Sequence, residues 1–166
     1  KPERIIVGLE RKDASLGKYY KKFLKSFKCP ILKMNYESAE LTKITINIFL
    51  ASSVTVSNAM ARLCKQISAN WFDIVPALKL DKRIGPYAYT KPGLGISGGN
   101  LERDLFTAKI LANKDKYSLN LINSFISNSK YMKNWVLRVI KSEIKNKRTG
   151  IFGLTYKDKT NSIKNS

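Results

Sequence analysis

The segment between Pro92 and Asp104 carries the residues of this chain whose types and spacing could most directly support chemistry. It reads Pro-Gly-Leu-Gly-Ile-Ser-Gly-Gly-Asn-Leu-Glu-Arg-Asp. Glycines let a backbone approach a ligand closely, and a helix that begins near Asn100 would offer unpaired amides and a positive dipole to an anionic group. Asp104 follows Asn100 by one turn and so shares its helix face. We therefore expect a substrate-binding loop, whose glycines are Gly93, Gly95, Gly98 and Gly99.

On residue chemistry alone, Asn100 and Asp104 also have structural interpretations. Asparagine is among the best helix N-cap residues and stabilises a helix by about 1 kcal/mol relative to alanine. Asp104 would then be a solvated acid in the first turn, where the helix dipole favours a carboxylate. The glycines also match G-x-G-x-x-G, but residues 83–92 before them contain two prolines and no strand pattern. Because the dinucleotide-binding fingerprint needs a strand at that place, we assign no dinucleotide to these glycines.

Lys43 and Asn47 form a second polar pair, spaced so that both side chains project from one side of a helix. They lie in a stretch from 37 to 67 without glycine or proline, which predicts one long helix although part of it alternates like a strand. A lysine ammonium suits developing oxyanion charge; the alternative is a lysine that reaches into solvent beside a polar helix residue. Apolar residues surround this helix on most faces, so we expect a second chain to cover it.

Composition excludes several kinds of chemistry. The 166 residues contain no histidine and two cysteines, Cys29 and Cys64, at unrelated positions, so neither imidazole catalysis, nor a metal site, nor a disulfide framework is expected. The net charge of +19 comes mainly from scattered lysines, whereas phosphate and base-edge recognition favours arginine, which argues against a nucleic-acid partner. No apolar stretch reaches the roughly 18 residues of a membrane span. We expect a cytoplasmic protein without membrane contact.

The remaining patterns predict a mainly α fold with a few short strands. The expected strands are 1–8, 29–33 and 150–156, and the expected helices beside 37–67 are 15–27, 70–80, 100–113, 117–128 and 131–146. Asn70 is the expected N-cap of the helix at 70–80. Residues 85–99 form a long loop, a feature that is often functional inside compact domains. Because the chain opens and closes on strand-like runs, we expect a fragment of a longer protein.

Three segments resemble the nucleotide-sugar dehydrogenases of the UDP-glucose/GDP-mannose dehydrogenase family. Residues 92–104 resemble P-G-x-G-x-G-G-x-C-x-x-K-D, residues 38–51 resemble S-A-E-L-x-K-x-x-x-N-x-x-L-A, and residues 150–166 resemble G-x-L-G-L-A-F-K-x-x-T-D-D-I-R-E-S. The resemblance implies a helical central dimerisation domain at 35–130. It would lie between the end of an NAD-binding domain at 1–34 and the start of a nucleotide-sugar-binding domain at 131–166, and the flanking strands would belong to these truncated α/β Rossmann-like domains.

The same resemblance implies site roles, a cofactor and partners. Lys43 and Asn47 would hold a substrate oxygen and an ordered water, and Asp104 would help to position water or neighbouring catalytic groups. Arg83 would reach the substrate across a subunit interface, and Lys157 would be a substrate-binding and cofactor-binding residue. The substrate would be a nucleotide-diphosphate sugar, the cofactor NAD bound mainly by another domain, and the assembly a homodimer through the long helix.

Asn100 stands where the family has its nucleophilic cysteine, and asparagine cannot form a thioester. Smaller departures from the family pattern occur at Ala59, Ser97, Gly99, Glu102 and Lys164. An oxidation arrested at the aldehyde would fit this replacement, and so would a non-catalytic relative that binds a nucleotide sugar without oxidising it. A basic nucleic-acid-binding module is a third alternative, motivated by charge alone.

Overall fold

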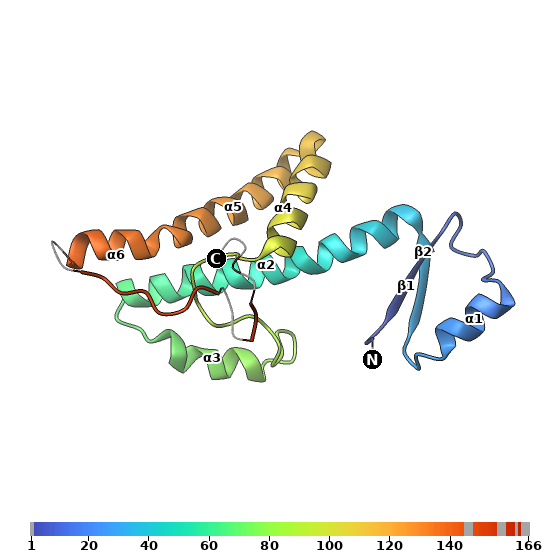
Figure 1. The fold of residues 1–166 in the computed structure, drawn as a ribbon, viewed down its shortest axis with the longest axis horizontal. Coiled ribbons are helices and arrows are strands. Elements are labelled where there is room, and N and C mark those ends of the chain that lie inside the picture. Colours follow the sequence, from blue (N-terminus) through green and yellow to red (C-terminus); the bar gives the residue numbers. More distant parts are fainter. Residues whose placement is uncertain (1, 145–147, 156–158, 162, 164–166) are drawn as a thin grey trace. The chain divides into compact units, whose positions relative to one another are not determined.

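The computed structural model describes residues 2–144, 148–155, 159–161 and 163, which are mostly helical (Figure 1). This confirms the predicted mainly α fold with a long helix and short strands. The chain divides into two compact units, residues 1–46 and 47–166.

The first unit contains two parallel strands joined by a helix. Strands β1 (Ile5–Leu9) and β2 (Ile31–Asn35) pair in parallel, with Ile5 opposite Ile31. Parallel neighbours need a crossover connection, and helix α1 (Lys18–Lys25) lies in it. Val7 and Leu24 are buried and form the small core of this unit. The predicted strand-helix-strand order is correct, and the second strand begins two residues later than expected.

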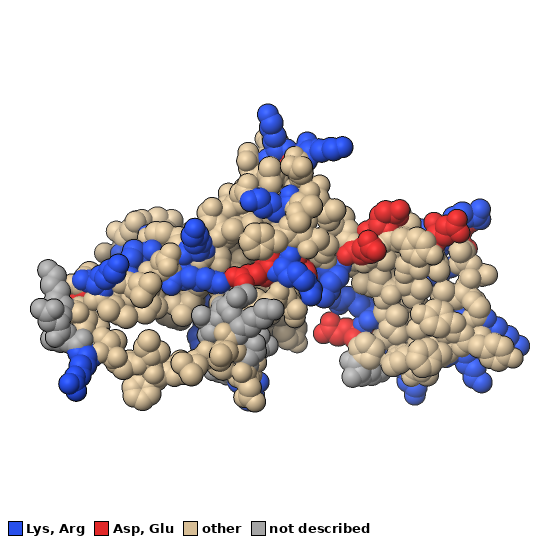
Figure 2. Space-filling model, turned by 45° about the horizontal axis from the view of Figure 1, so that its top comes forward, with Lys and Arg blue, Asp and Glu red and all other residues tan. Residues whose placement is uncertain are grey.

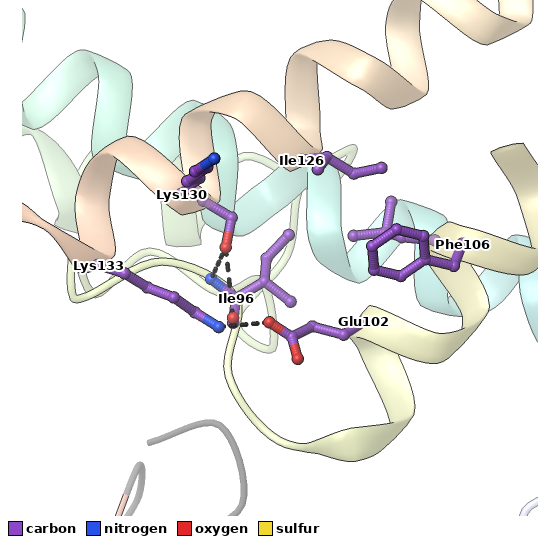
Figure 3. A pocket seen from close by; sticks show the side chains of 8 residues that line it. Ile96, Glu102, Phe106, Ile126, Lys130 and Lys133 are labelled. Carbon is purple, nitrogen blue, oxygen red and sulfur yellow. Dashed lines mark hydrogen bonds and ion pairs between the residues drawn. The ribbon is translucent and has the colours of Figure 1, made fainter.

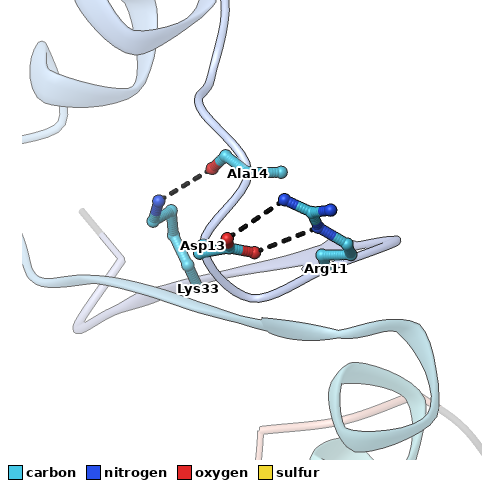
Figure 4. A network of polar contacts seen from close by, with 4 residues as sticks. All are labelled: Arg11, Asp13, Ala14 and Lys33. Carbon is cyan, nitrogen blue, oxygen red and sulfur yellow. Dashed lines mark hydrogen bonds and ion pairs between the residues drawn. The ribbon is translucent and has the colours of Figure 1, made fainter.

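Polar contacts hold the connection between β1 and α1, and one of them reaches β2 (Figure 4). Arg11 donates two hydrogen bonds to the Asp13 carboxylate, at 3.3 and 3.2 Å. Lys33 Nζ on β2 donates to the carbonyl of Ala14 at 2.9 Å. The Arg11–Asp13 pair is exposed, so it stabilises the fold by at most about 1 kcal/mol.

Helix α2 (Tyr36–Gln66) is the long helix predicted from the sequence. In the second unit, one side of it is buried at Asn47, Ala51 and Asn58. The opposite side exposes four large apolar residues, which we name the α2 stripe: Phe49, Val56, Met60 and Leu63. Their spacing of seven, four and three residues places them on one helix face. The chain therefore covers one face of α2 and leaves the other uncovered, rather than burying it on most sides.

By length and composition alone, α2 could cross a membrane, since it contains an 18-residue window that is sufficiently apolar. This corrects the expectation that no stretch of the chain has that length. The core helix of a water-exposed domain passes the same test. Because α2 buries polar side chains such as Asn47 and Asn58 on one side, we assign it no membrane role.

The second unit continues with α3 (Trp71–Leu80), α4 (Gly99–Leu111), the 3₁₀ turn η1 (Ala112–Lys114), α5 (Lys116–Lys133) and α6 (Trp135–Glu143). Asn70 caps α3 as predicted, because its Oδ1 accepts from the backbone of Phe72 at 3.1 Å. Asp115 caps α5 in the same way. The break between the last two helices lies at Asn134, four residues later than expected.

The predicted strand at 150–156 does not form within its described part. Residues 150–155 have no regular structure, and the Phe152 side chain is fully exposed. A strand requires a hydrogen-bonded neighbour, and no described residue pairs with this segment. Residue 156 lies outside the described residues.

Basic side chains are spread over the face seen in Figure 2. On the face in Figure 2, lysines and arginines are separated by other residues and by acidic side chains. A nucleic-acid footprint usually gathers basic residues into one patch or stripe, and this face carries no single one.

Candidate active site

Hydrogen bonds with side chains of α2 and α3 hold the loop that contains the glycines. Ser57 Oγ donates to the carbonyl of Tyr89 at 2.7 Å, and the Trp71 ring nitrogen donates to the carbonyl of Thr90 at 2.9 Å. The backbone amide of Gly93 donates to Asn58 Oδ1 at 2.8 Å. Asn58 is 1% exposed, so a buried side-chain amide fixes the backbone of the loop at Gly93.

The middle of the loop is held by α5. Ser129 Oγ accepts from the Ile96 amide at 2.9 Å and donates to the Ile96 carbonyl at 3.3 Å. Gly95 has a φ of +90°, and a Cβ there would lie 2.7 Å from the carbonyl oxygen of Ser129. Both facts require glycine at this position. Gly95 therefore serves loop packing, and its predicted contact with substrate stays a prediction.

Helix α4 begins two residues earlier than a cap at Asn100 would require. Gly98 is the N-cap, with φ 83° and ψ 160°, and α4 starts at Gly99. A φ in this region favours glycine over other residues, so the turn into the helix is made before Asn100. The capping interpretation of Asn100 is wrong: it is the second helical residue and is exposed. Gly93 is also exposed, whereas Gly98 is buried and Gly99 half-buried.

Asn47 and Asp104, predicted separately, lie together in the second unit. Asn47 Nδ2 on α2 donates a short hydrogen bond to Asp104 Oδ2 on α4, and Arg103 Nε donates to Asp104 Oδ1 at 2.8 Å. Asn47 is 8% and Asp104 3% exposed. A buried carboxylate with oriented donors can hold a water or receive a proton from a reacting group. Asp104 is therefore buried, and the interpretation of it as a solvated acid in the first helical turn is wrong.

Lys43 and Lys157 are two further predicted site residues. Lys43 is one turn before Asn47 on α2, and in the first unit it lines a shallow hollow with Glu3, Arg4, Ile6 and Ile46. Lys157 lies outside the described residues. The predicted roles of both stay predictions.

Arg83 follows α3 and is paired locally. Its guanidinium donates to both carboxylate oxygens of Asp81, at 3.0 and 2.6 Å. This contact lowers the pKa of Asp81 and raises the pKa of Arg83. The Arg83 side chain is 89% exposed, so it can reach outward from the chain.

A cavity of about 190 Å³ lies between α4 and α5 beside the loop (Figure 3). Its walls include Ile96, Leu105, Phe106 and Ile126, and Lys133 forms an ion pair with Glu102 at its edge. Sequence reasoning missed the contacts of Ser129 and Lys133. No local signal marks them, because each partner lies more than thirty residues away.

Among the described residues, no group of three or more His, Cys, Asp or Glu side chains could hold a metal ion. Gly93 to Gly98 follow an irregular segment instead of a strand, which agrees with the rejection of the fingerprint. The connection from β1 to α1 contains Gly17 alone, not the three glycines that hold a pyrophosphate.

Comparison with known proteins identifies relatives of this chain. The UDP-glucose/GDP-mannose dehydrogenase family, central domain, matches residues 37–139. A UDP-glucose 6-dehydrogenase of Rickettsia prowazekii (strain Madrid E) is 31% identical over 171 residues, which cover 99% of this chain and 39% of that protein. UDP-glucose 6-dehydrogenase TuaD of Bacillus subtilis (strain 168) is 27% identical over 143 residues, covering 84% and 31%.

Among solved structures, a UDP-glucose dehydrogenase from the hyperthermophilic archaeon Pyrobaculum islandicum matches with a TM-score of 0.71 and 26% identity. The match covers 85% of this chain and 32% of the solved one. This chain therefore spans about two fifths or less of the length of these relatives.

Proposed function

Because this chain belongs to the UDP-glucose/GDP-mannose dehydrogenase family, we propose that it is part of an NAD-dependent oxidoreductase that oxidises the C6 alcohol of a nucleotide-diphosphate sugar. In this proposal residues 35–130 are the central domain. Residues 1–34 belong to the NAD-binding domain, and residues 131–166 to the nucleotide-sugar-binding domain. The location is cytoplasmic.

The buried Asn47–Asp104 pair is the observation that carries this proposal. It joins α2 to the first turns of α4, one turn from position 100. Burial keeps water from competing for the carboxylate, and the Asn47 amide and the Arg103 guanidinium orient it. A carboxylate held in this way can fix an attacking water or take the proton that an alcohol loses on oxidation. Lys43, one turn earlier on α2, would stabilise negative charge on the substrate oxygen.

NAD supplies the hydride acceptor when it is bound. We assign its binding mainly to the NAD-binding domain of the intact protein. This chain's contribution is the surface that holds the substrate and the reacting water.

Asn100 determines how far the oxidation goes. A thiolate at this position would add to the aldehyde carbon, and loss of a second hydride would give a thioester that water cleaves to the acid. The asparagine amide is not a nucleophile of this kind. We therefore propose that the reaction stops at the aldehyde, with one NADH formed per sugar.

The test is turnover by the complete gene product with NAD and a panel of nucleotide sugars. NADH absorbance and product masses would be followed together. We expect an aldehyde from the natural protein and a sugar acid, with a doubled NADH yield, from Asn100→Cys. Asn100→Ala is the matched control, because it changes the same position without adding a thiol. Substantial acid from the natural protein would contradict the arrested oxidation.

The second candidate is a non-catalytic relative that binds nucleotide sugars, and Asn100 is the observation that favours it. In this case calorimetry would show tight binding of a nucleotide sugar, while neither the natural protein nor Asn100→Cys would form NADH. The same experiment therefore separates the two functions.

A homodimer through α2 is part of the proposed function. The α2 stripe supports it, because its four apolar residues lie on one face and are 40 to 71% exposed. Apolar residues at this spacing suit packing against a second helix. A copy of the same chain would supply that helix by twofold symmetry.

Val56→Lys is expected to weaken this dimer about 30-fold or more, because it places a charge in the centre of an apolar interface. Sedimentation equilibrium would measure the dissociation constant. Gln66→Lys is the control, since it adds the same charge to an exposed position of α2 outside the stripe. A natural chain that stays monomeric at micromolar concentration would contradict the dimer.

A further inference from the structure

Two residues one turn apart on α5 hold both ends of the segment that carries Asn100 (Figure 3). Ser129 binds the amide and the carbonyl of Ile96. Lys133, four residues further along α5, forms an ion pair with Glu102. We name Ser129 and Lys133 the α5 clamp. Because both lie on the same helix face, one rigid element fixes both ends of the segment.

Of the two contacts of the clamp, that of Ser129 is buried and that of Lys133 is half-buried. Ser129 is 7% exposed, and the side chains of Lys133 and Glu102 are 32% and 25% exposed. An ion pair that is mostly withdrawn from water is screened less than a surface pair. The clamp can therefore hold the segment in place more strongly than a fully exposed ion pair would.

The segment between these two anchors has little rigidity of its own. It includes Gly98 and Gly99, and the first turn of α4 has no side-chain cap. Uncapped first turns leave amides without partners and tend to fray. Asn100 is exposed in this turn, so its position depends on the contacts that hold the turn to α5.

We propose that Ser129 and Lys133 are positioning residues that fix the group at position 100 toward the substrate. This inference rests on the proposed function in one respect, namely that the group at position 100 faces a substrate. The clamp holds the segment whether or not the protein turns over a substrate. Loss of either clamp residue would leave Asn47 and Asp104 in place and release the turn that carries Gly98, Gly99 and position 100.

Amide hydrogen exchange on the full chain tests the clamp directly. Ser129→Ala and Lys133→Gln should each speed exchange of the amides in residues 102–105, the first in α4 with intrahelical carbonyl partners, by about tenfold, because local opening would become easier. Exchange in α3 should stay unchanged. Lys130→Gln is the matched control: Lys130 lies between the clamp residues, lines the same cavity and is exposed. Lys133→Arg, which keeps the charge, should behave like the natural chain.

A thiol introduced by Asn100→Cys gives a second readout at the position itself. Its alkylation rate by iodoacetamide, followed by peptide mass spectrometry to separate it from Cys29 and Cys64, should change at least about threefold with Lys133→Gln across the pH range of thiolate formation. Reversing the pair, with Glu102→Lys and Lys133→Glu together, should restore the parent rate. A structural role distant from position 100 would not move this rate.

Exchange and alkylation rates within about twofold of the Lys130→Gln control would overturn the proposal. If the clamp variants loosen the segment in a protein that never oxidises a nucleotide sugar, the clamp stands and the proposed function fails. If the complete protein is active and the clamp variants match the control in both rates and in kcat, the clamp fails and the proposed function stands.

Discussion

Gly95→Ala is expected to destabilise the second unit by roughly 2–6 kcal/mol, which would lower the melting temperature by about 5–20 °C. Two effects add at this position. The backbone φ of +90° strains any residue with a Cβ, and the new methyl group would lie 2.7 Å from the Ser129 carbonyl oxygen. Neither α5 nor the loop can move away easily, because Ser129 also binds Ile96.

Substitutions at two other glycines allow the backbone strain at Gly95 to be measured separately from its steric clash with Ser129. Gly85 has a φ of +79° and open space around its Cβ position, so Gly85→Ala should show strain alone, at about 1–2 kcal/mol. Gly93 has open space and no positive φ, so Gly93→Ala should be neutral or stabilise by up to about 1 kcal/mol. Thermal or urea unfolding would measure all three. Equal losses at Gly95 and Gly93 would show that the loop does not pack on α5 in this way.

Asn47→Ala is expected to lower turnover about 100-fold or more in the complete protein and to destabilise this chain by about 2–3 kcal/mol. The substitution removes a donor to a carboxylate that is 3% exposed. A buried carboxylate that loses a hydrogen bond cannot recover it fully from water. Initial rates and urea unfolding would measure the two effects.

Arg103 offers a matched comparison, because it binds the other oxygen of the same carboxylate. Its side chain is 61% exposed, so Arg103→Gln should destabilise by only about 0–1 kcal/mol. In a double-mutant cycle, Asn47→Ala with Asp104→Ala should cost at least about 1 kcal/mol less than the sum of the single changes. Additive effects would mean that Asn47 and Asp104 do not interact.

The sequence was a good guide where structure is set by neighbouring residues. The stretch without glycine or proline predicted α2 to within one residue at each end. Asn70 was predicted as a cap and is one, because the bond spans two residues. Asn100 was predicted as a cap and is not, because Gly98 makes the turn through a backbone conformation that residue type alone does not reveal.

Pairing between distant segments was beyond the sequence. Asn47 and Asp104 are 57 residues apart, and Ile96 and Ser129 are 33 apart. A single residue such as Ser129 belongs to no sequence pattern that predicts its hydrogen-bond partner, because the partner depends on which groups the fold brings together.

The sequence by itself determined the family motifs, the helical fold class and the absence of histidine and of a metal-ligand pattern, because these depend on residue types and short spacings. Tertiary structure decided which side of α2 is buried, that Asp104 is a buried carboxylate, and that Gly95 serves packing. The physical reason is that burial and hydrogen-bond satisfaction depend on which surfaces meet after the chain folds.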